Sequence, residues 1–376
     1  MLKILTIAQT RQVEAEANAS GYTYAQMMAD AGAAAAQRAL ALLEGRPDVK
    51  ITLLVGAGNN GGDGLVAGVH LAQALGTNGL VRFYLLTQRD SDSDAVFKAV
   101  VDAGLFVAYA EHDTDGRVLR HMVASADLVI DALFGIGARL PLRDAPARVL
   151  RLARQAIADR ARETHTPQVI YPSAADTQPT VKPLVLAIDC PSGLDCDSGA
   201  LDSLVLAADE TVTFIAAKPG LLTFPGAAAV GRLCVAPLDM SNRVQSPTLE
   251  QARAILLDSA AVREMLPPRP VNAHKGTFGR ATIVGGSGEY TGAVGLSARA
   301  AYASGAGLVT VAAPSHVTNA LTGHLLEATW RALPDSEGAL SPDGMTALKA
   351  LLQQSQTLLV GPGMGRAVTT RAFLEA

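Results

Sequence analysis

The 376-residue chain contains only three cysteines, Cys190, Cys196 and Cys234. Three cysteines are too few for a disulfide framework and are typical of a reducing compartment, so we expect a cytoplasmic protein. Cys190 and Cys196 have neither the spacing of a metal-binding pair nor a histidine nearby, and we interpret them as packing residues.

The chain also lacks a large excess of either charge and long uninterrupted hydrophobic runs. The net charge is -4, and aromatic residues make up 4% of the chain. Such a surface does not attract polyanions and offers no platform for stacked bases, so we expect no nucleic-acid partner. Apolar runs such as AGAAAAQRALALLEG are interrupted by Gln37, Arg38 and Glu44, and the first residues do not resemble a secretory signal. We therefore expect no membrane partner.

Short apolar segments typical of buried strands alternate with helical patterns. Strands are predicted at 50–56, 80–87, 126–135, 183–189, 210–216 and 232–237, and helices at 10–43, 64–75, 91–103 and 145–158. A polar insertion is predicted at 160–182. After a linker at 241–250 come predicted strands at 280–286, 308–314 and 357–363, with a helix at 292–304. This alternation predicts parallel sheets covered on both faces, in α/β domains at 1–243 and 244–376.

The most distinctive motif is VGAGNNGGDGLVAG at residues 55–68, between a predicted strand and a predicted helix. Gly56, Gly58 and Gly61 fit the G-x-G-x-x-G pattern of dinucleotide-binding turns. The second strand ends without the usual acidic residue, but Arg89 could hold a 2′-phosphate, which leaves an NADP-dependent oxidoreductase open. The amides and carboxylate of residues 59–63 instead favour a ligand with hydroxyl groups, or a cation.

Two further carboxylates lie where strands are predicted to end, Asp131 in IDALFGIG and Asp189 in AIDCPSGLDCDSG. The carboxyl ends of strands face the ligand crevice in an open α/β sheet, so these segments and the glycine motif are expected to converge. Amide, carboxylate and hydroxyl oxygens suit an alkali or alkaline-earth cation, and a carboxylate there can also transfer protons. The alternative is that both aspartates only cap loops.

Four motifs occur in order: GAGNNGGDG, DALFGIG, AIDCPSGLDCDSG and TVTFIAAKPG. Over about residues 1–240 the chain thereby resembles the NAD(P)H-hydrate epimerase family. The resemblance implies a Rossmann-like three-layer α/β/α domain with a potassium ion, which interconverts the R and S hydrates at C6 of the nicotinamide ring. The chain has Ala29-Asp30-Ala31-Gly32 where the family usually has Glu-Asn-Ala-Gly, which leaves the role of that helix open.

The resemblance also implies roles for individual residues. Asp189 is the expected catalytic acid or base, and Lys218 is expected near the ligand. Asn60, Asp131 and Ser192 are the expected potassium ligands. The expected substrate contacts are Asn59, Asn60, Gly61, Gly62, Asp63, Gly135, Ile136, Gly137, Ala138, Arg139, Leu140, Pro141 and Asp189.

The segments at 274–314 and 358–366 resemble the ADP-dependent NAD(P)H-hydrate dehydratase, whose fold is ribokinase-like. This resemblance implies that Ala293 and Gly365 contact the hydrate, and that ADP or ATP with magnesium is used if the domain is complete. The family's later G-x-G-D motif does not occur, so we expect the amino-terminal part of such a domain. The expected substrate is NADHX or NADPHX and the expected assembly a homo-oligomer, with a non-catalytic binding module as a further alternative.

Overall fold

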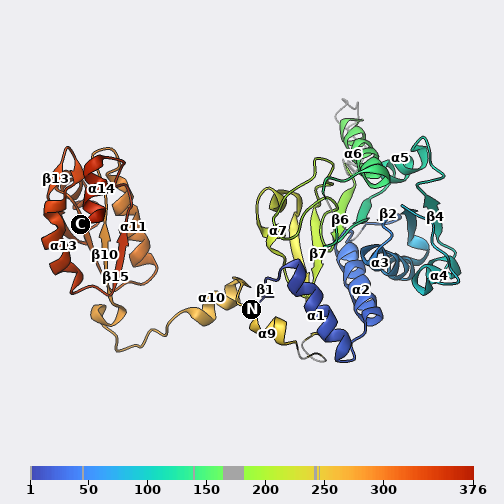
Figure 1. The fold of residues 1–376 in the computed structure, drawn as a ribbon, viewed down its shortest axis with the longest axis horizontal. Coiled ribbons are helices and arrows are strands. Elements are labelled where there is room, and N and C mark those ends of the chain that lie inside the picture. The colour runs from blue at the N-terminus through green and yellow to red at the C-terminus, as the bar shows by residue number, and fades with distance from the viewer. Residues whose placement is uncertain (1, 45, 139, 164–181, 241–243, 245) are drawn as a thin grey trace, which may run out of the picture. The chain divides into compact units, whose positions relative to one another are not determined.

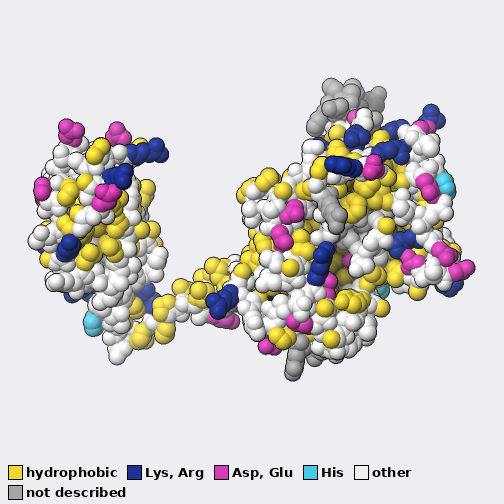
Figure 2. All heavy atoms as spheres, in the orientation of Figure 1, with side chains coloured by type: hydrophobic (Ala, Val, Ile, Leu, Met, Phe, Trp, Pro, Cys, Tyr) yellow, Lys and Arg dark blue, Asp and Glu magenta, His cyan; other side chains and the backbone are white. Residues whose placement is uncertain are grey.

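The structure is a computed structural model that describes residues 2–376 except 45, 139, 164–181, 241–243 and 245. The chain divides into two compact units, Met1–Met265 and Leu266–Ala376 (Figure 1). No described helix is both long enough and apolar enough to cross a bilayer. On the face drawn in Figure 2, basic and acidic side chains are interspersed.

A seven-stranded sheet forms the centre of the first unit, and all its neighbouring strands are parallel. The strand order is β4-β3-β2-β5-β6-β7-β8. The strands are β2 (Val49–Val55), β3 (Gly79–Leu85), β4 (Phe106–Tyr109), β5 (Leu128–Ala132), β6 (Leu184–Ile188), β7 (Glu210–Phe214) and β8 (Arg232–Ala236).

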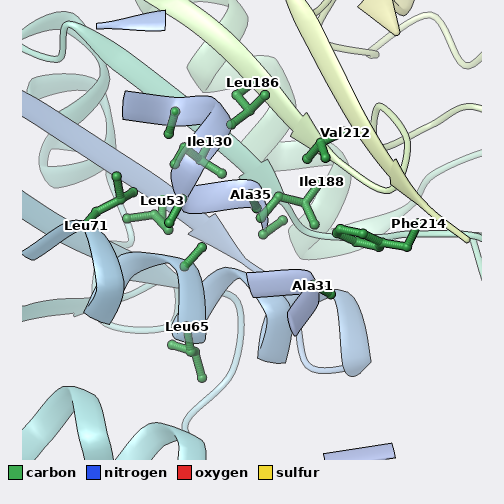
Figure 3. Close-up of a cluster of buried hydrophobic side chains, with 14 of the residues drawn as sticks. Ala31, Ala35, Leu53, Leu65, Leu71, Ile130, Leu186, Ile188, Val212 and Phe214 are labelled. Atoms are coloured by element: carbon green, nitrogen blue, oxygen red, sulfur yellow. The ribbon is translucent and has the colours of Figure 1, made fainter. Parts of the chain in front are cut away.

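Helices cover both faces of this sheet. On one face, α2 (Tyr24–Leu42), α3 (Asn59–Leu75) and α4 (Ala95–Asp102) pack on strand residues that include Leu53 and Ile130 (Figure 3). On the other, α5 (Arg117–Ala124) and α6 (Asp144–Glu163) pack on residues such as Leu54 and Val129. Successive strand side chains point to opposite faces, so an apolar run supplies both cores. The expected three-layer α/β/α architecture is confirmed.

The helical segment predicted at 10–43 is two helices, α1 (Ile7–Ala19) and α2. Thr6 and Thr23 each begin a helix with a capping box, and Gly21 between them has a φ of 94°. The helix predicted at 64–75 begins at Asn59, so the polar glycine motif is the first part of α3 rather than a turn before it. The predicted insertion at 160–182 lies mostly outside the described residues.

The first unit extends beyond the predicted boundary at 243/244. β1 (Leu2–Lys3) pairs antiparallel with β9 (Ile255–Leu256). Glu16 of α1 accepts hydrogen bonds from the hydroxyls of Ser246 and Thr248, which begin α9 (Pro247–Gln251). The compact unit therefore includes these elements and α10 (Ser259–Met265), while the boundary between functional domains stays a prediction.

The second unit contains a four-stranded parallel sheet in the order β12-β11-β10-β15. Its strands are β10 (Arg280–Val284), β11 (Leu308–Pro314), β12 (Thr329–Leu333) and β15 (Thr357–Val360), and β13 (Asp335–Ser336) and β14 (Ala339–Leu340) form a hairpin. One face packs on α11 (Gly292–Ala303) and α12 (Ser315–Leu321), the other on α13 (Met345–Leu352) and α14 (Val368–Glu375). The expected α/β class of this half is confirmed.

Candidate active site

A cavity of about 490 Å³ lies where the central strands of the first unit end. The loops after β2 and β5 and the residue after β6 line it, as expected for the ligand crevice of such a sheet. Eight of the predicted residues line this cavity: Asn59, Asn60, Asp63, Gly135, Ile136, Gly137, Asp189 and Lys218. Lining residues that sequence reasoning missed include Thr10, Arg11 and Glu14 of α1 and Phe214 of β7.

Asp189 is held in place on several sides. Its backbone has a φ of 66°, the left-handed region that few non-glycine residues adopt. Its Oδ1 accepts hydrogen bonds from Nζ of Lys218 at 2.8 Å and from the hydroxyl of Thr213 at 3.1 Å. Its Oδ2 accepts from the backbone N–H of Ile136 at 3.0 Å. The side chain is 12% exposed, so the carboxylate is fixed yet accessible from the cavity.

Lys218 is a buried lysine, with a side chain only 1% exposed. Besides the bond to Asp189, its Nζ donates to the Thr213 hydroxyl at 2.6 Å and to the Phe214 carbonyl at 3.1 Å. An ammonium group has three donors, and all three are used within the protein. Lys218 therefore stabilises the Asp189 carboxylate.

Asp131 and Ser192 form a buried pair behind the cavity. The Ser192 hydroxyl donates to Asp131 Oδ1 at 2.6 Å, and the Ser192 N–H donates to Oδ2 at 2.8 Å. The Leu133 N–H also donates to Oδ1, at 3.2 Å. Burial raises the pKa of Asp131, against the lowering effect of the Ser192 bonds. These contacts are also the ones that a loop-capping aspartate makes.

Asn60 is buried, and among the described residues its side-chain oxygen and nitrogen have no hydrogen-bond partner. A Cβ atom placed on Gly135 would lie 3.4 Å from Asn60 Oδ1 and 2.6 Å from Asp189 Oδ2. The amide and the carboxylate therefore approach the same point beside Gly135. A buried amide without a partner is rare in proteins and points to a bound ligand, ion or water.

Two more carboxyl groups share the cavity. Burial raises the pKa of Asp63 well above its ordinary value, and the charges of Asp189 and Glu14 add to this while Lys218 opposes it. Burial, and then the charge of Asp189, raise the pKa of Glu14, while Lys218 and Arg11 lower it. The structure thus places three carboxyl groups around one buried lysine.

The other predicted contacts lie elsewhere. Gly61 and Gly62 are packing positions of α3. A Cβ on Gly61 would lie 2.0 Å from the Gly56 carbonyl oxygen, and a Cβ on Gly62 would lie 2.6 Å from Met28 Cε. Ala138, Leu140 and Pro141 line a neighbouring cavity of about 450 Å³. Arg139 lies outside the described residues.

Arg89 holds the glycine-rich segment. Its Nη2 donates to the Gly56 carbonyl at 2.9 Å, and its Nη1 pairs with Asp94 at 2.6 Å. The guanidinium that could have held a 2′-phosphate in an NADP-binding turn is thus bound within the protein.

In the second unit, the glycine-rich segment after β15 contains the predicted contact Gly365 and passes close to the predicted contact Ala293. A Cβ on Gly363 would lie 2.8 Å from Ala293 Cβ, and one on Gly365 would lie 3.5 Å from Ser287 Oγ. The Ser287 hydroxyl is buried, and no described residue forms a hydrogen bond with it.

Comparisons with known proteins agree with this division. Residues 24–220 match the family described as YjeF-related protein N-terminus, and residues 281–376 match NAD(P)H-hydrate dehydratase. The bifunctional NAD(P)H-hydrate repair enzyme of Moorella thermoacetica is 34% identical over 84% of this chain and 55% of its own length. That of Hyperthermus butylicus is 32% identical over 98% of this chain and 61% of its own.

A solved crystal structure of a yeast protein is 19% identical, with a TM-score of 0.45 over 60% of this chain and 86% of that one, a likeness too slight to support any conclusion. The chain spans less than two thirds of the length of the curated relatives given above. These matches do not favour the oxidoreductase or binding-module alternatives, and they confirm the resemblance to NAD(P)H-hydrate repair proteins. The chain belongs to the YjeF-related protein family through residues 24–220, followed by a dehydratase-family segment at 281–376.

Proposed function

We propose that the first unit epimerises the hydrates of NADH and NADPH at C6 of the nicotinamide ring. The observation that carries the proposal is the Asp189 carboxylate, which Lys218, Thr213 and Ile136 fix at the wall of the cavity. The names of the relatives support the choice of substrate.

The chemistry of the hydrate explains why a fixed carboxylate is useful. Its C6 carries a hydroxyl group and is bonded to the ring nitrogen N1. If the hydroxyl leaves as water, the N1 lone pair forms a C6=N1 bond, and water can return to either face of the ring. The leaving hydroxyl needs a proton, and the returning water must lose one. In this proposal Asp189 exchanges that proton, which is general acid–base catalysis.

We propose that Asn60, Asp131 and Ser192 hold a potassium ion. Amide, carboxylate and hydroxyl oxygens are hard donors that suit such an ion, and the buried amide of Asn60, which has no partner among the described residues, fits this role. When bound, the ion would supply positive charge beside the acidic cavity.

We propose that the second unit takes part, within a complete dehydratase domain, in dehydration of the S hydrate with ADP or ATP and magnesium. The dehydratase match supports this, as does the buried Ser287 hydroxyl near Gly365, which has no hydrogen-bond partner among the described residues.

The test of the epimerase proposal follows R/S interconversion by chromatography, starting from the separated R hydrate of NADH and subtracting the spontaneous rate. Asp189→Asn keeps the shape of the side chain but cannot exchange a proton near neutral pH, so it should abolish the catalysed rate. Asp92→Asn, at an exposed aspartate before α4, is the matched control and should keep the parental rate. A parental rate in Asp189→Asn would remove the acid–base role from this residue.

A further inference from the structure

Proton exchange at two faces of one ring calls for a second group opposite Asp189. We infer that Glu14 of α1 is this second proton-transfer residue, an inference that rests on the epimerase function proposed above. Glu14 lies outside the 24–220 segment through which the chain matches its family.

The position of Glu14 carries the inference. It lines the 490 Å³ cavity with Asp189 and also a cavity of about 400 Å³, and both cavities include Asn59, Asp63 and Phe214. Glu14 therefore lies where the two spaces meet. It comes from a helix, whereas Asp189 follows a strand of the sheet, so the two carboxyl groups belong to different walls.

The wall formed by α1 is fixed in place. Val13, next to Glu14, and Ala17, one turn later, are fully buried in the main core. At its start, the Ile7 N–H donates to Asp197 at 2.8 Å, and the Leu5 N–H just before it donates to the Ala217 carbonyl at 2.9 Å. Fixed elements hold catalytic groups in productive geometry better than mobile ones.

The two carboxyl groups can divide the chemistry. Glu14 gives its proton to the C6 hydroxyl, the C6–O bond breaks with its electron pair going to oxygen, and water leaves. Water then adds to C6 from the side of Asp189, which takes the released proton, while the C6=N1 electrons return to nitrogen. When the other hydrate is the substrate, Asp189 acts as the acid and Glu14 as the base. After each turnover, proton exchange with solvent returns both carboxyl groups to their starting protonation states.

The charges around Glu14 fit a proton donor. Asp63 of α3 and Asp189 face it with negative charge, and Arg11 and Lys218 with positive charge. Burial and Asp189 raise the pKa of Glu14, whereas the Lys218 ammonium bonds directly to Asp189. On the α9 side of α1, Glu16 is bound to Ser246 and Thr248, and α9 itself carries Glu250. Paired carboxyl groups in unequal environments typically supply the acid and the base of one site.

The test compares Glu14→Gln with Glu16→Gln, the same substitution two residues along the same helix. General acid catalysis contributes about 100-fold or more, so Glu14→Gln should lower kcat at least that far with little change in KM. It should also remove the alkaline limb of the bell-shaped pH–rate profile. Glu16→Gln should keep the parental rate and profile. The double variant Glu14→Gln/Ala29→Glu returns a carboxyl group to the 400 Å³ cavity, which Ala29 also lines, and should recover part of the rate.

Three results would overturn the inference. One is near-parental kcat in Glu14→Gln. Another is a loss confined to KM with an unchanged pH profile, which would make Glu14 a binding group. The third is loss of activity that Ala29→Glu does not restore and that accompanies a lowered melting temperature. A parental chain no faster than the spontaneous reaction would instead refute the epimerase proposal itself.

Discussion

Removing the buried ammonium of Lys218 tests whether it acts chiefly on Asp189. Lys218→Met keeps most of the side-chain volume but removes the charge and all three donors. The Asp189 carboxylate then loses its cation, and the Phe214 carbonyl loses a hydrogen bond of 3.1 Å. Asp189→Asn is the reciprocal change, because it leaves the ammonium buried without a counter-charge.

Breaking a buried ion pair by removing one partner costs about 3–5 kcal/mol of unfolding free energy. Asp189 is 12% exposed, so water recovers part of that loss, and we expect about 3 kcal/mol for Lys218→Met. At roughly 2–4 °C per kcal/mol for a unit of this size, the melting temperature should fall by about 6–12 °C. The double variant Lys218→Met/Asp189→Asn has neither charge. Its loss of unfolding free energy should therefore be about 2 kcal/mol smaller than the sum of the two single losses.

Hydrogen exchange of the backbone amides in β6 and β7 measures these losses within the first unit alone, with Asp92→Asn as the control. If the sum of the two single losses equals the loss of the double variant within about 0.5 kcal/mol, Lys218 and Asp189 act independently. The idea that Lys218 acts through its charge on Asp189 would then be wrong. Lys218→Met should also lose epimerase activity, since Asp189 is then held by fewer donors.

Three further results are expected. Gly135→Ala puts a Cβ 2.6 Å from Asp189 Oδ2 and should slow epimerisation about tenfold or more with little change in melting temperature, because the carboxylate must move; an unchanged rate would contradict this geometry. Arg11→Gln removes a cation that lines the cavity and should raise KM for the anionic substrate at low salt only, as rates across ionic strength would show. Hydrogen bonds from Ser246 and Thr248 lower the pKa of Glu16 from 4.5 to about 2, so its contribution to stability is complete above pH 4.5 and is lost towards pH 2. Hydrogen exchange of the α9 backbone amides should therefore become faster, relative to the unfolded chain, as the pH falls from 4.5 to about 2. Glu16→Gln should abolish this loss of protection.

The layers of the fold could be predicted because parallel strands covered on both faces are apolar runs. β2 and β5 are such runs, and the helices between strands follow from the alternation. β4 was missed because it is a short edge strand with one exposed and three half-buried residues, which gives no clear pattern. The start of α3 was placed too late because glycines usually indicate a turn, and here they let α3 pack closely against Gly56 and Met28.

The part of the site that could be predicted from the sequence is the set of residues that follow the ends of strands. Asp189 and Asn60 follow strands in the chain, so the order of the motifs already implies that they converge. Glu14 has no such signal, because α1 reaches the cavity only through long-range pairing. Ile4 forms a bridge with Ala217, and β1 pairs with β9, and neither contact has a local pattern in the sequence. Since the same pairings place Glu14 at the cavity, part of the proposed epimerase site depends on contacts made outside the matched segment. A fragment limited to 24–220 should therefore bind and react poorly even if its sheet folds.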